Sequence, residues 1–328
     1  MKLRHSIPII LVVLYGVVPL LLQHNNYIMS ILVASLTIAG IALAWSLLGN
    51  LGGMVSFGHA AFFGVGSYTS AILTMKMGVP VFPAILFGGI GAAIASIAVL
   101  PALRLAGPYF ALAILAYANI FRILATEFTS LTGGAGGLLG IPLFPELFGF
   151  NFGSKLGSYL IITSIVLIFA VIYRMIRTSY HGFALLAMIE GEDSTRVVGV
   201  NSTFLKAMML FLSAFMTGII GAFNAHYINF LEPDYAFSGV WTMIPIVAAI
   251  FGGYRTLTGP IIGAIVVYTV DQLIFKALIP SGHQIILGAL LTLMILFAPD
   301  GLIPLFSKKL SWARRVKENR SPQTGHIC

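Results

Sequence analysis

The segment from Ile28 to Leu48 reads IMSILVASLTIAGIALAWSLL and contains no charged side chain. An α-helix rises about 1.5 Å per residue, so about 20 apolar residues cross the roughly 30 Å hydrocarbon core of a bilayer. A helix satisfies all of its backbone amides internally, which the hydrocarbon demands because it offers no water. The segment is therefore predicted to be a membrane-spanning helix.

Nine further stretches have the same character, and together they predict an all-α, polytopic integral membrane helical bundle of about ten transmembrane helices. They cover residues 7–22, 54–75, 81–103, 108–126, 157–173, 207–228, 239–254, 260–276 and 284–303. The first follows Lys2 and Arg4 as in a signal peptide, but residues 19–25 lack a small-x-small cleavage pattern. We expect it to remain as the first span.

The composition supports this class of protein. Of 328 residues, 59% are hydrophobic and 9% are charged, against roughly 25% charged in soluble domains. The net charge of +8 is attributed to membrane topology rather than to nucleic-acid binding, because the basic residues flank apolar spans. The single cysteine, Cys328, excludes a disulfide within the chain.

Lysine and arginine are distributed unevenly between the two sides of this predicted bundle. With the N-terminus inside, 14 of the 18 fall on the internal side, and the external side keeps only Lys76, Arg122, Lys155 and Lys276. Positive charge favours the cytoplasmic side, so both termini are predicted to be cytoplasmic. The expected organisation is a transmembrane domain at 1–306, with an external loop at about 127–156 and a cytoplasmic loop at about 174–206, then a basic cytoplasmic tail at 307–328.

Sequence patterns for catalysis are missing. The chain contains no Gly-Lys-Ser/Thr, no HExxH, no GxSxG and no Cys/His cluster, so neither ATP hydrolysis nor metal or cofactor chemistry is expected of it. An intramembrane enzyme would need a catalytic cluster that the sequence lacks. A secondary transporter driven by an ion gradient stays an alternative; it predicts that uptake collapses with an uncoupler and that Asp271 is indispensable.

The cytoplasmic loop contains the pattern of a short helix. Glu190, Glu192 and Asp193 stand near its expected start, where acidic residues favour the helix dipole, and Gly199 marks its expected end. Such a helix can be a docking site for a soluble partner or merely a solvated loop, and the local pattern leaves both open.

Polar residues on apolar helices are the candidates for a translocation path: Ser56, His59, Tyr109 and Asn119. Each can instead bond a neighbouring carbonyl. The glycines in the spans predict close helix packing. A weaker pattern repeats at an offset of 200, as in Gly52-Gly53 and Gly252-Gly253, and suggests an internal repeat.

Four segments resemble the permease subunits of branched-chain amino acid ABC transporters, in particular the longer, LivM-type member of the pair. These segments are GMVSFGHAAFFGVGSY at 53–68, RLAGPYFAL at 104–112, LTGG at 131–134 followed by Gly137-Leu138, and Gly252-Gly253 through Thr258-Gly259-Pro260 to Gly263. Their order and spacing are specific, and the resemblance covers nearly the whole chain. It implies an importer subunit that moves branched-chain or related small amino acids by alternating access in a bacterial-type cytoplasmic (inner) membrane; related permeases carry urea or short amides.

The resemblance also implies a site and partners. It identifies the cytoplasmic loop as the coupling helix that docks on the ATPases, with Glu190, Glu192, Asp193, Arg196 and Gly199 as its residues. The family commonly has a pair of alanines where this chain has Ser194-Thr195 and then Arg196. The implied partners are two cytoplasmic ATPase subunits, a second related permease, an extracytoplasmic solute-binding protein and membrane lipid.

Overall fold

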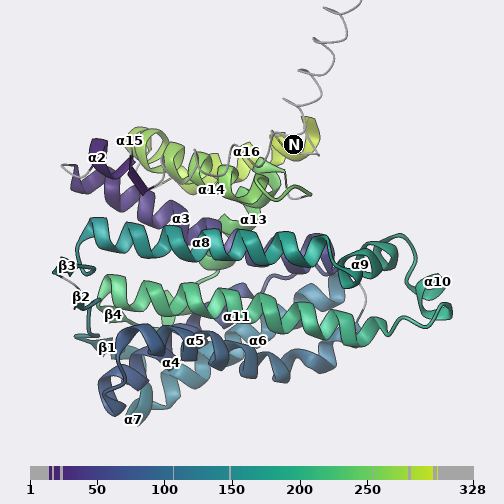
Figure 1. Ribbon diagram of the computed structural model, residues 1–328, viewed down its shortest axis with the longest axis horizontal. Coiled ribbons are helices and arrows are strands. Elements are labelled where there is room, and N and C mark those ends of the chain that lie inside the picture. The colour runs from purple at the N-terminus through teal and green to yellow at the C-terminus, as the bar shows by residue number, and fades with distance from the viewer. Residues whose placement is uncertain are drawn as a thin grey trace, which may run out of the picture.

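The computed structural model describes residues 15–16, 18–22, 25–105, 107–147, 149–253, 255–279, 282–297 and 301. Long helices run roughly side by side along the longest axis of the molecule (Figure 1). The first half contains α2 (Val18–Leu22), α3 (Asn26–Ser46) with its π-helical extension η2 (Leu47–Leu51), α4 (His59–Met77), α5 (Val81–Ala95) with its 3-10 extension η3 (Ser96–Arg104), α6 (Pro108–Glu127), α7 (Thr129–Thr132) and η4 (Gly134–Gly136). The second half contains α8 (Lys155–Arg177), α9 (Tyr180–Glu190), α10 (Glu192–Val197), α11 (Ser202–Ile228), α12 (Pro233–Ala236), α13 (Val240–Gly252), α14 (Gly259–Val270) with η5 (Asp271–Phe275) and α15 (Lys276–Leu278), and α16 (His283–Phe297).

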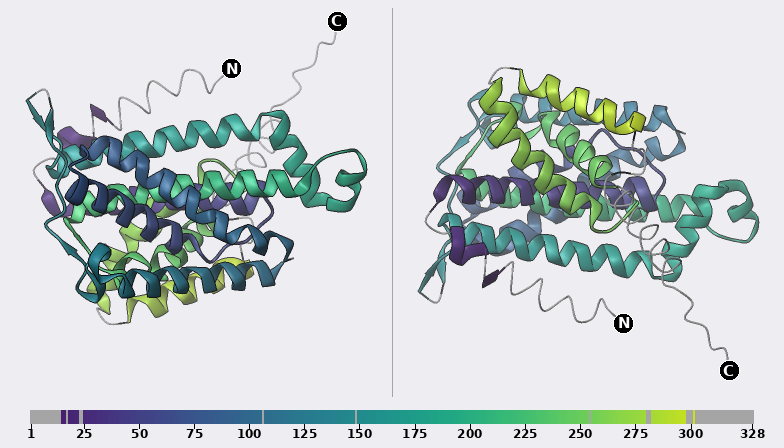
Figure 2. Two further views of the ribbon diagram at one scale, coloured as in Figure 1. Left: turned by 90° about the horizontal axis from the view of Figure 1, so that it is seen from below. Right: turned by 90° about the horizontal axis from the view of Figure 1, so that it is seen from above.

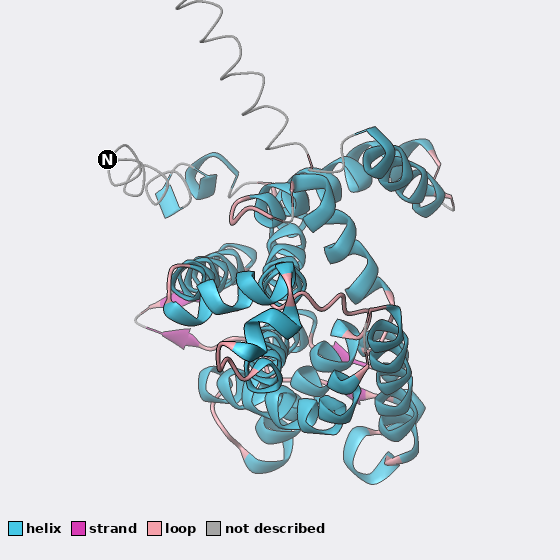
Figure 3. Ribbon diagram, turned by 90° about the vertical axis from the view of Figure 1, so that its right-hand side faces the viewer, coloured by secondary structure: helices cyan, strands magenta, loops and turns pink. Residues whose placement is uncertain are grey.

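Within these described residues, the strands are two short antiparallel pairs (Figure 3). β1 (Leu138–Leu139) pairs with β4 (Phe230–Leu231), with Leu138 opposite Leu231. β2 (Glu146–Leu147) pairs with β3 (Phe150–Asn151), with Glu146 opposite Asn151. The predicted all-α class is confirmed, since the strands only fasten connecting segments.

Seven helical segments of the described part are long and apolar enough to cross a bilayer, so the chain is a multi-pass membrane protein. They are Asn26–Leu51, Val81–Arg104, Pro108–Glu127, Lys155–Arg177, Ser202–Ile228, Pro233–Gly252 and Gly259–Leu278. Of the remaining predicted spans, 7–22 lies mostly outside the described residues, and 284–303 coincides with the 15-residue α16. The last, 54–75, coincides with the 19-residue α4. The count of ten stays a prediction.

The helices begin where the sequence supplies a cap. Asn25 accepts a hydrogen bond from the Ile28 amide through its side chain, and Asn201 accepts one from the Phe204 amide. This second cap explains why α11 begins at Ser202, one turn before the predicted start at 207. The predicted span at 54–75 in turn starts later, at His59, because Gly53 takes a positive φ of 67° and residues 52–58 are not helical.

The core lies around α3 and between α4, α5 and α11. In α3, 89% of the most apolar stretch is buried, against 28% for α6 and 22% for the segment 259–278. Glycines bring the other three helices together, as predicted: a Cβ on Gly66 of α4 would collide with the backbone of Gly218 in α11, and one on Gly88 of α5 would meet Ala222. Close approach of this kind replaces the hydrophobic drive in lipid.

The two long connecting segments lie at opposite ends of the bundle. α9 and α10 project from one end, and the strand pairs with α7 cover the other (Figures 1 and 2). At the strand end, the buried His226 of α11 contacts the Ser70 hydroxyl at 2.8 Å through Nε2 and the Pro142 carbonyl at 2.7 Å through Nδ1. This contact fastens the connecting segment to the helices.

Candidate functional site

The projecting end is built from two short helices. α9 starts after Ser179, whose hydroxyl accepts a hydrogen bond from the Gly182 amide. Gly191 separates α9 from α10 in an extended conformation, with φ of −173°. Glu190 is therefore the last residue of α9 and not part of the short helix whose start it was predicted to mark, because the chain bends at Gly191.

The end of α10 has the hydrogen bonds of a Schellman motif. The Gly199 amide donates to the Arg196 carbonyl at 2.9 Å, and the Val200 amide donates to the Thr195 carbonyl at 3.4 Å. Gly199 has a φ of +89°, a conformation in which a side chain is disfavoured. The predicted glycine stop is present.

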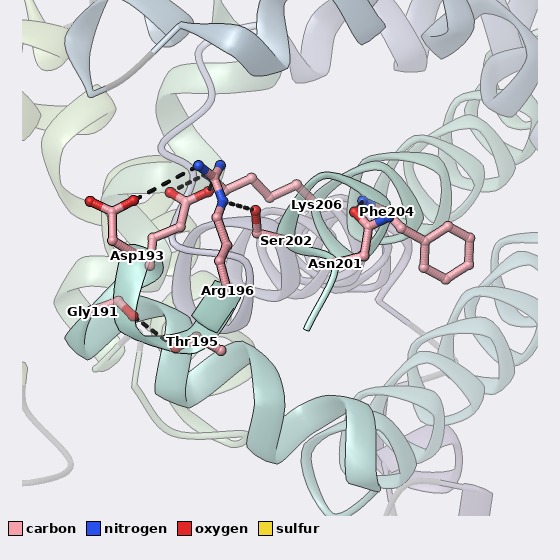
Figure 4. Close-up of polar contacts among 9 residues, drawn as sticks. Gly191, Asp193, Thr195, Arg196, Asn201, Ser202, Phe204 and Lys206 are labelled. Atoms are coloured by element: carbon pink, nitrogen blue, oxygen red, sulfur yellow. Dashed lines mark hydrogen bonds and ion pairs between the residues drawn. The ribbon is translucent and has the colours of Figure 1, made fainter. Parts of the chain in front are cut away.

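Glu192 joins α10 to α11, and Figure 4 shows its partners Arg196 and Lys206. One carboxylate oxygen lies 2.7 Å from the Arg196 guanidinium within α10, and the other lies 2.7 Å from the Lys206 ammonium in α11. Arg196 also donates to the Ser202 hydroxyl at 2.7 Å, while its contact with Asp193 is longer, at 3.8 Å. The short helix is thus tied to the start of a membrane span by two independent links.

The surroundings of Glu192 favour its charged form. The hydrogen bond from Lys206 is the main cause that holds the pKa of this carboxyl below its ordinary value, and the nearby Arg196 acts in the same direction. Only 32% of the Glu192 side chain and 20% of the Lys206 side chain are exposed. The pair is accordingly less screened by water than a surface ion pair.

The outer face of this projecting end combines acidic and apolar groups. Glu190 and Asp193 are exposed, and apolar side chains within residues 180–198 are exposed as well. They include Tyr180, Phe183, Ile189, Val197 and Val198. Apolar side chains gathered at the end of a membrane protein, with charges beside them, are typical of a protein interaction surface.

Two of the four path candidates are fully buried. Ser56 accepts a hydrogen bond from the Gly58 amide at 3.3 Å. His59 lies 2.9 Å from the Ser213 hydroxyl through Nε2, and Ser213 donates to the Ala44 carbonyl. This chain of contacts links the start of α4 to α11 and α3.

The other two candidates lie on the exposed face of α6. Tyr109 is 70% exposed, and the exposed Asn119 donates to the Leu115 carbonyl at 3.2 Å. The structure therefore buries Ser56 and His59 near the start of α4 and leaves Tyr109 and Asn119 exposed on α6.

Sequence reasoning missed Lys206 and Ser202 as partners of the predicted coupling helix. Lys206 was counted only as a cytoplasmic charge, and its distance of 14 residues from Glu192 follows no helical period. The available indication was that three acidic residues, Glu190, Glu192 and Asp193, precede the basic residues Arg196 and Lys206. No group of three or more His, Cys, Asp or Glu that could hold a metal ion occurs in the described part of the chain.

Comparison with known proteins places these features in a family context. A family model described as the branched-chain amino acid transport system permease component matches residues 27–296. The high-affinity branched-chain amino acid transport system permease protein LivM of Escherichia coli is 28% identical over 305 residues, covering 85% of this chain and 71% of the relative. Its counterpart in Salmonella typhimurium is 27% identical over 308 residues, with 84% and 71% coverage.

A second kind of permease is also similar. The protein LivH of Escherichia coli is 24% identical over 284 residues, covering 81% of this chain and 91% of the relative. No solved structure matches the chain.

Proposed function

Because the chain belongs to the family of branched-chain amino acid transport permease components, we propose that it is the membrane-spanning permease subunit of an ATP-driven importer of branched-chain amino acids. The observation that carries the mechanism is the double link from α10 to α11 through Glu192 and Arg196. The chain is a permease component rather than an enzyme, and ATP is hydrolysed on separate subunits.

The two ATPase subunits lie on the cytoplasmic side, and one of them docks on the projecting end of this chain. Their contact surface is the exposed apolar set Tyr180, Phe183, Ile189, Val197 and Val198, with Glu190 and Asp193 supplying charge. Movement of α10 is transmitted to α11 through Lys206 and Ser202. Since α11 packs against α3, α4 and α5, such a movement reaches the core of the bundle.

The remaining partners are assigned to other surfaces. The projecting end is cytoplasmic, so the strand pairs β1–β4 and β2–β3 lie outside and meet the solute-binding protein. The membrane is the cytoplasmic (inner) membrane of a bacterial-type cell. Both termini and the basic tail at 307–328 are assigned to the cytoplasmic side; residues 1–14 and 302–328 lie outside the described residues.

The second permease covers the exposed face of α6. A polar amide such as that of Asn119 is costly against lipid tails, which supports a protein-lined or water-lined surface there. Tyr109 and Asn119 then line the path between the two permeases. Ser56 and His59, being buried, reach the solute only when α4 moves relative to α11.

Purification of the tagged chain in mild detergent, followed by mass spectrometry of the proteins that accompany it, tests the assembly. Two ATPases and a second permease are expected, and loss of the ATPases on replacing Val197 and Val198 with aspartate would locate their docking surface. The matched control replaces Val171, an exposed residue of α8, with a polar threonine. A chain that comes out alone contradicts the proposal.

Uptake of labelled leucine in vesicles separates the proposal from its alternatives. ATP-dependent uptake that survives an uncoupler supports an ABC importer. Uptake that collapses with the uncoupler and with Asp271→Asn favours ion coupling; Asp271 is 2% exposed and begins the π-helical η5. ATP-dependent uptake of urea or an amide, without leucine, would change the substrate class alone.

A further inference from the structure

A cavity of about 550 Å³ opens between α10, the start of α11, the loop before α4 and the start of α6. Most of its wall is apolar and includes Val55, Leu105, Phe110 and Leu112. Its charged wall is formed by Glu192 and Lys206, the same pair that ties α10 to α11. The cavity thus combines a volume typical of small-molecule sites with one pair of opposite charges.

We propose that this cavity is a binding site for a zwitterionic aliphatic amino acid on the α10 side of the membrane, and that occupancy of the site loosens the link between α10 and α11. The choice of ligand and of side rests on the proposed function. The ammonium group of the ligand pairs with Glu192, its carboxylate pairs with Lys206, and its aliphatic side chain lies against the apolar wall.

Charge complementarity selects this occupant over simpler ones. A zwitterion places opposite charges on neighbouring atoms, so it can face an ion pair without leaving either protein charge unpaired. An anion alone would meet the Glu192 carboxylate, and a cation alone would meet the Lys206 ammonium. The positive end of the α6 dipole, beginning at Pro108 in the same wall, adds to the field that favours a carboxylate near Lys206.

The geometry also couples the site to the moving segment. The ligand ammonium competes with Lys206 for the Glu192 carboxylate, and the ligand carboxylate competes with Glu192 for the Lys206 ammonium. Without a ligand, these two side chains lie 2.7 Å apart. A ligand that shares these charges weakens the ion pair between Glu192 and Lys206 while leaving the Arg196–Ser202 hydrogen bond in place. Amino acid that accumulates inside is therefore expected to slow its own import.

Binding is measured on the full chain in lipid nanodiscs, using labelled L-leucine as the probe. We expect saturable binding, with 4-methylpentanoic acid, which lacks the ammonium, and 3-methylbutylamine, which lacks the carboxylate, each at least about tenfold weaker as competitors. Glu192→Gln and Lys206→Met are expected to weaken leucine binding by a similar factor. Glu146→Gln, an exposed carboxylate at the strand end, is the matched control and should bind as the parent chain does.

A second variant tests the cavity without changing the ion pair, in case the Glu192 and Lys206 variants misfold. Val55→Trp fills the cavity and keeps both charges, so it should abolish leucine binding, while Val171→Trp on the exposed face of α8 should not. Equal binding by Val55→Trp and the parent chain would overturn the proposal. So would equal competition by the deaminated acid, which would mean that the cavity takes apolar groups regardless of charge, or a lack of saturable binding.

Vesicles containing the complete importer test the effect on transport. Leucine preloaded on the α10 side should slow import by the parent importer and leave the Val55→Trp importer unaffected; equal slowing overturns the regulatory part of the proposal. Normal ATP-driven uptake without cavity-dependent binding means that this inference fails alone. Cavity-dependent binding by a chain that forms no importer means that the proposed function fails instead.

Discussion

At the residue scale, Glu192 serves two partners with its two carboxylate oxygens, one in its own helix and one in the next. A carboxylate that accepts from two cations at once is a stronger link than a single exposed ion pair. Asp193, one position on, has a fully exposed side chain and only the longer contact with Arg196. Neighbouring acidic residues thus have different roles: Glu192 holds α10 in place, and Asp193 is available to a partner.

The lowered pKa of Glu192 gives a pH dependence with a definite sign. A carboxyl group whose folded pKa lies below its unfolded pKa stabilises the fold above the unfolded value, and the contribution is lost as the pH falls through the folded pKa. The link between α10 and α11 should therefore persist from neutral pH down to 4.5, the ordinary value, and loosen only below it. Spin labels at Ser194→Cys and Thr203→Cys, in a Cys328→Ser chain, measure the distance between α10 and α11. The distance distribution should be narrow while the link persists and should broaden at the pH where the link loosens.

Two substitutions sharpen this measurement. Glu192→Gln should give a broad distribution at every pH, because the amide cannot pair with Lys206 and Arg196 as an anion. Asp193→Asn should keep the distribution of the parent chain. Broadening of the parent distribution between neutral pH and about pH 5 would contradict the assignment to Glu192.

At the element scale, α10 is terminated by the backbone of Gly199. A Cβ there meets open space, so the cost of a substitution is only the strain of the left-handed backbone conformation, roughly 1–2 kcal/mol. Gly199→Leu should lower leucine uptake by about tenfold with the chain still in the membrane, because α10 no longer ends where the Schellman bonds place it. Uptake assays with membrane levels measured by immunoblot check this.

Gly191 provides the matched control for Gly199. It is extended, with φ of −173°, a conformation open to any residue, and a Cβ would make only ordinary contacts with Ser194. Gly191→Ala should transport nearly as the parent does. Normal uptake in the Gly199→Leu chain would sink the role of this helix end in coupling.

Helix packing by glycine is testable in the same way. A Cβ on Gly218 would overlap Ala92 and the backbone of α5, whereas one on Gly288 of α16 meets nothing within 4 Å. Gly218→Ala should lower the free energy of unfolding by about 1–3 kcal/mol, the usual cost of overpacking, and Gly288→Ala should not. Thermal unfolding in detergent compares the two; equal melting temperatures would argue against tight packing of α5 on α11.

The membrane-spanning helices were predictable from sequence because the length of an apolar run alone defines a span. The glycine stop of α10 was predictable because a helix cap depends on neighbouring residues only. The 3-10 segment η3 was not: it contains Pro101, which lacks an amide hydrogen and disrupts a helix, yet the apolar run continues through it. The strand pairs were missed for another reason, since Leu138 and Leu231 meet only in the folded chain. The Glu192–Lys206 pair and the buried contacts of His59 share this dependence on tertiary structure.

The echo at an offset of 200 has a local counterpart in the structure. Gly53 and Gly253 both have positive φ, and the next helices begin at His59 and Gly259. Packing differs, however: α14 lies against α13 through Gly252 and Gly263, while Gly66 of α4 meets Gly218 of α11 and Gly64 meets Phe237. The shared pattern is a helix end followed by a turn, and a true repeat stays a hypothesis.

At the scale of the whole molecule, the chain has one projecting end and one strand-covered end. Topology predicts that the first is cytoplasmic. With Cys328→Ser as background, a cysteine at Gly136, which is exposed and has open space around it, should react with an impermeant maleimide on intact cells. A cysteine at Ser194 should react only after the cells are permeabilised, and the reverse pattern would invert the assigned topology.

The central position of α3 has a consequence for biosynthesis. Its neighbours α8, α11, α13 and α14 all follow it in the chain, so a ribosome has released α3 into the membrane long before any of them exists. Its apolar sequence, with a mean hydropathy of 2.2, lets it wait in lipid until those helices insert and displace the lipid tails around it. Assembly of this permease therefore cannot proceed strictly from one end, and a chain truncated before α13 leaves the side of α3 that packs against α13 and α14 facing lipid, where quality-control proteases of the membrane would encounter it.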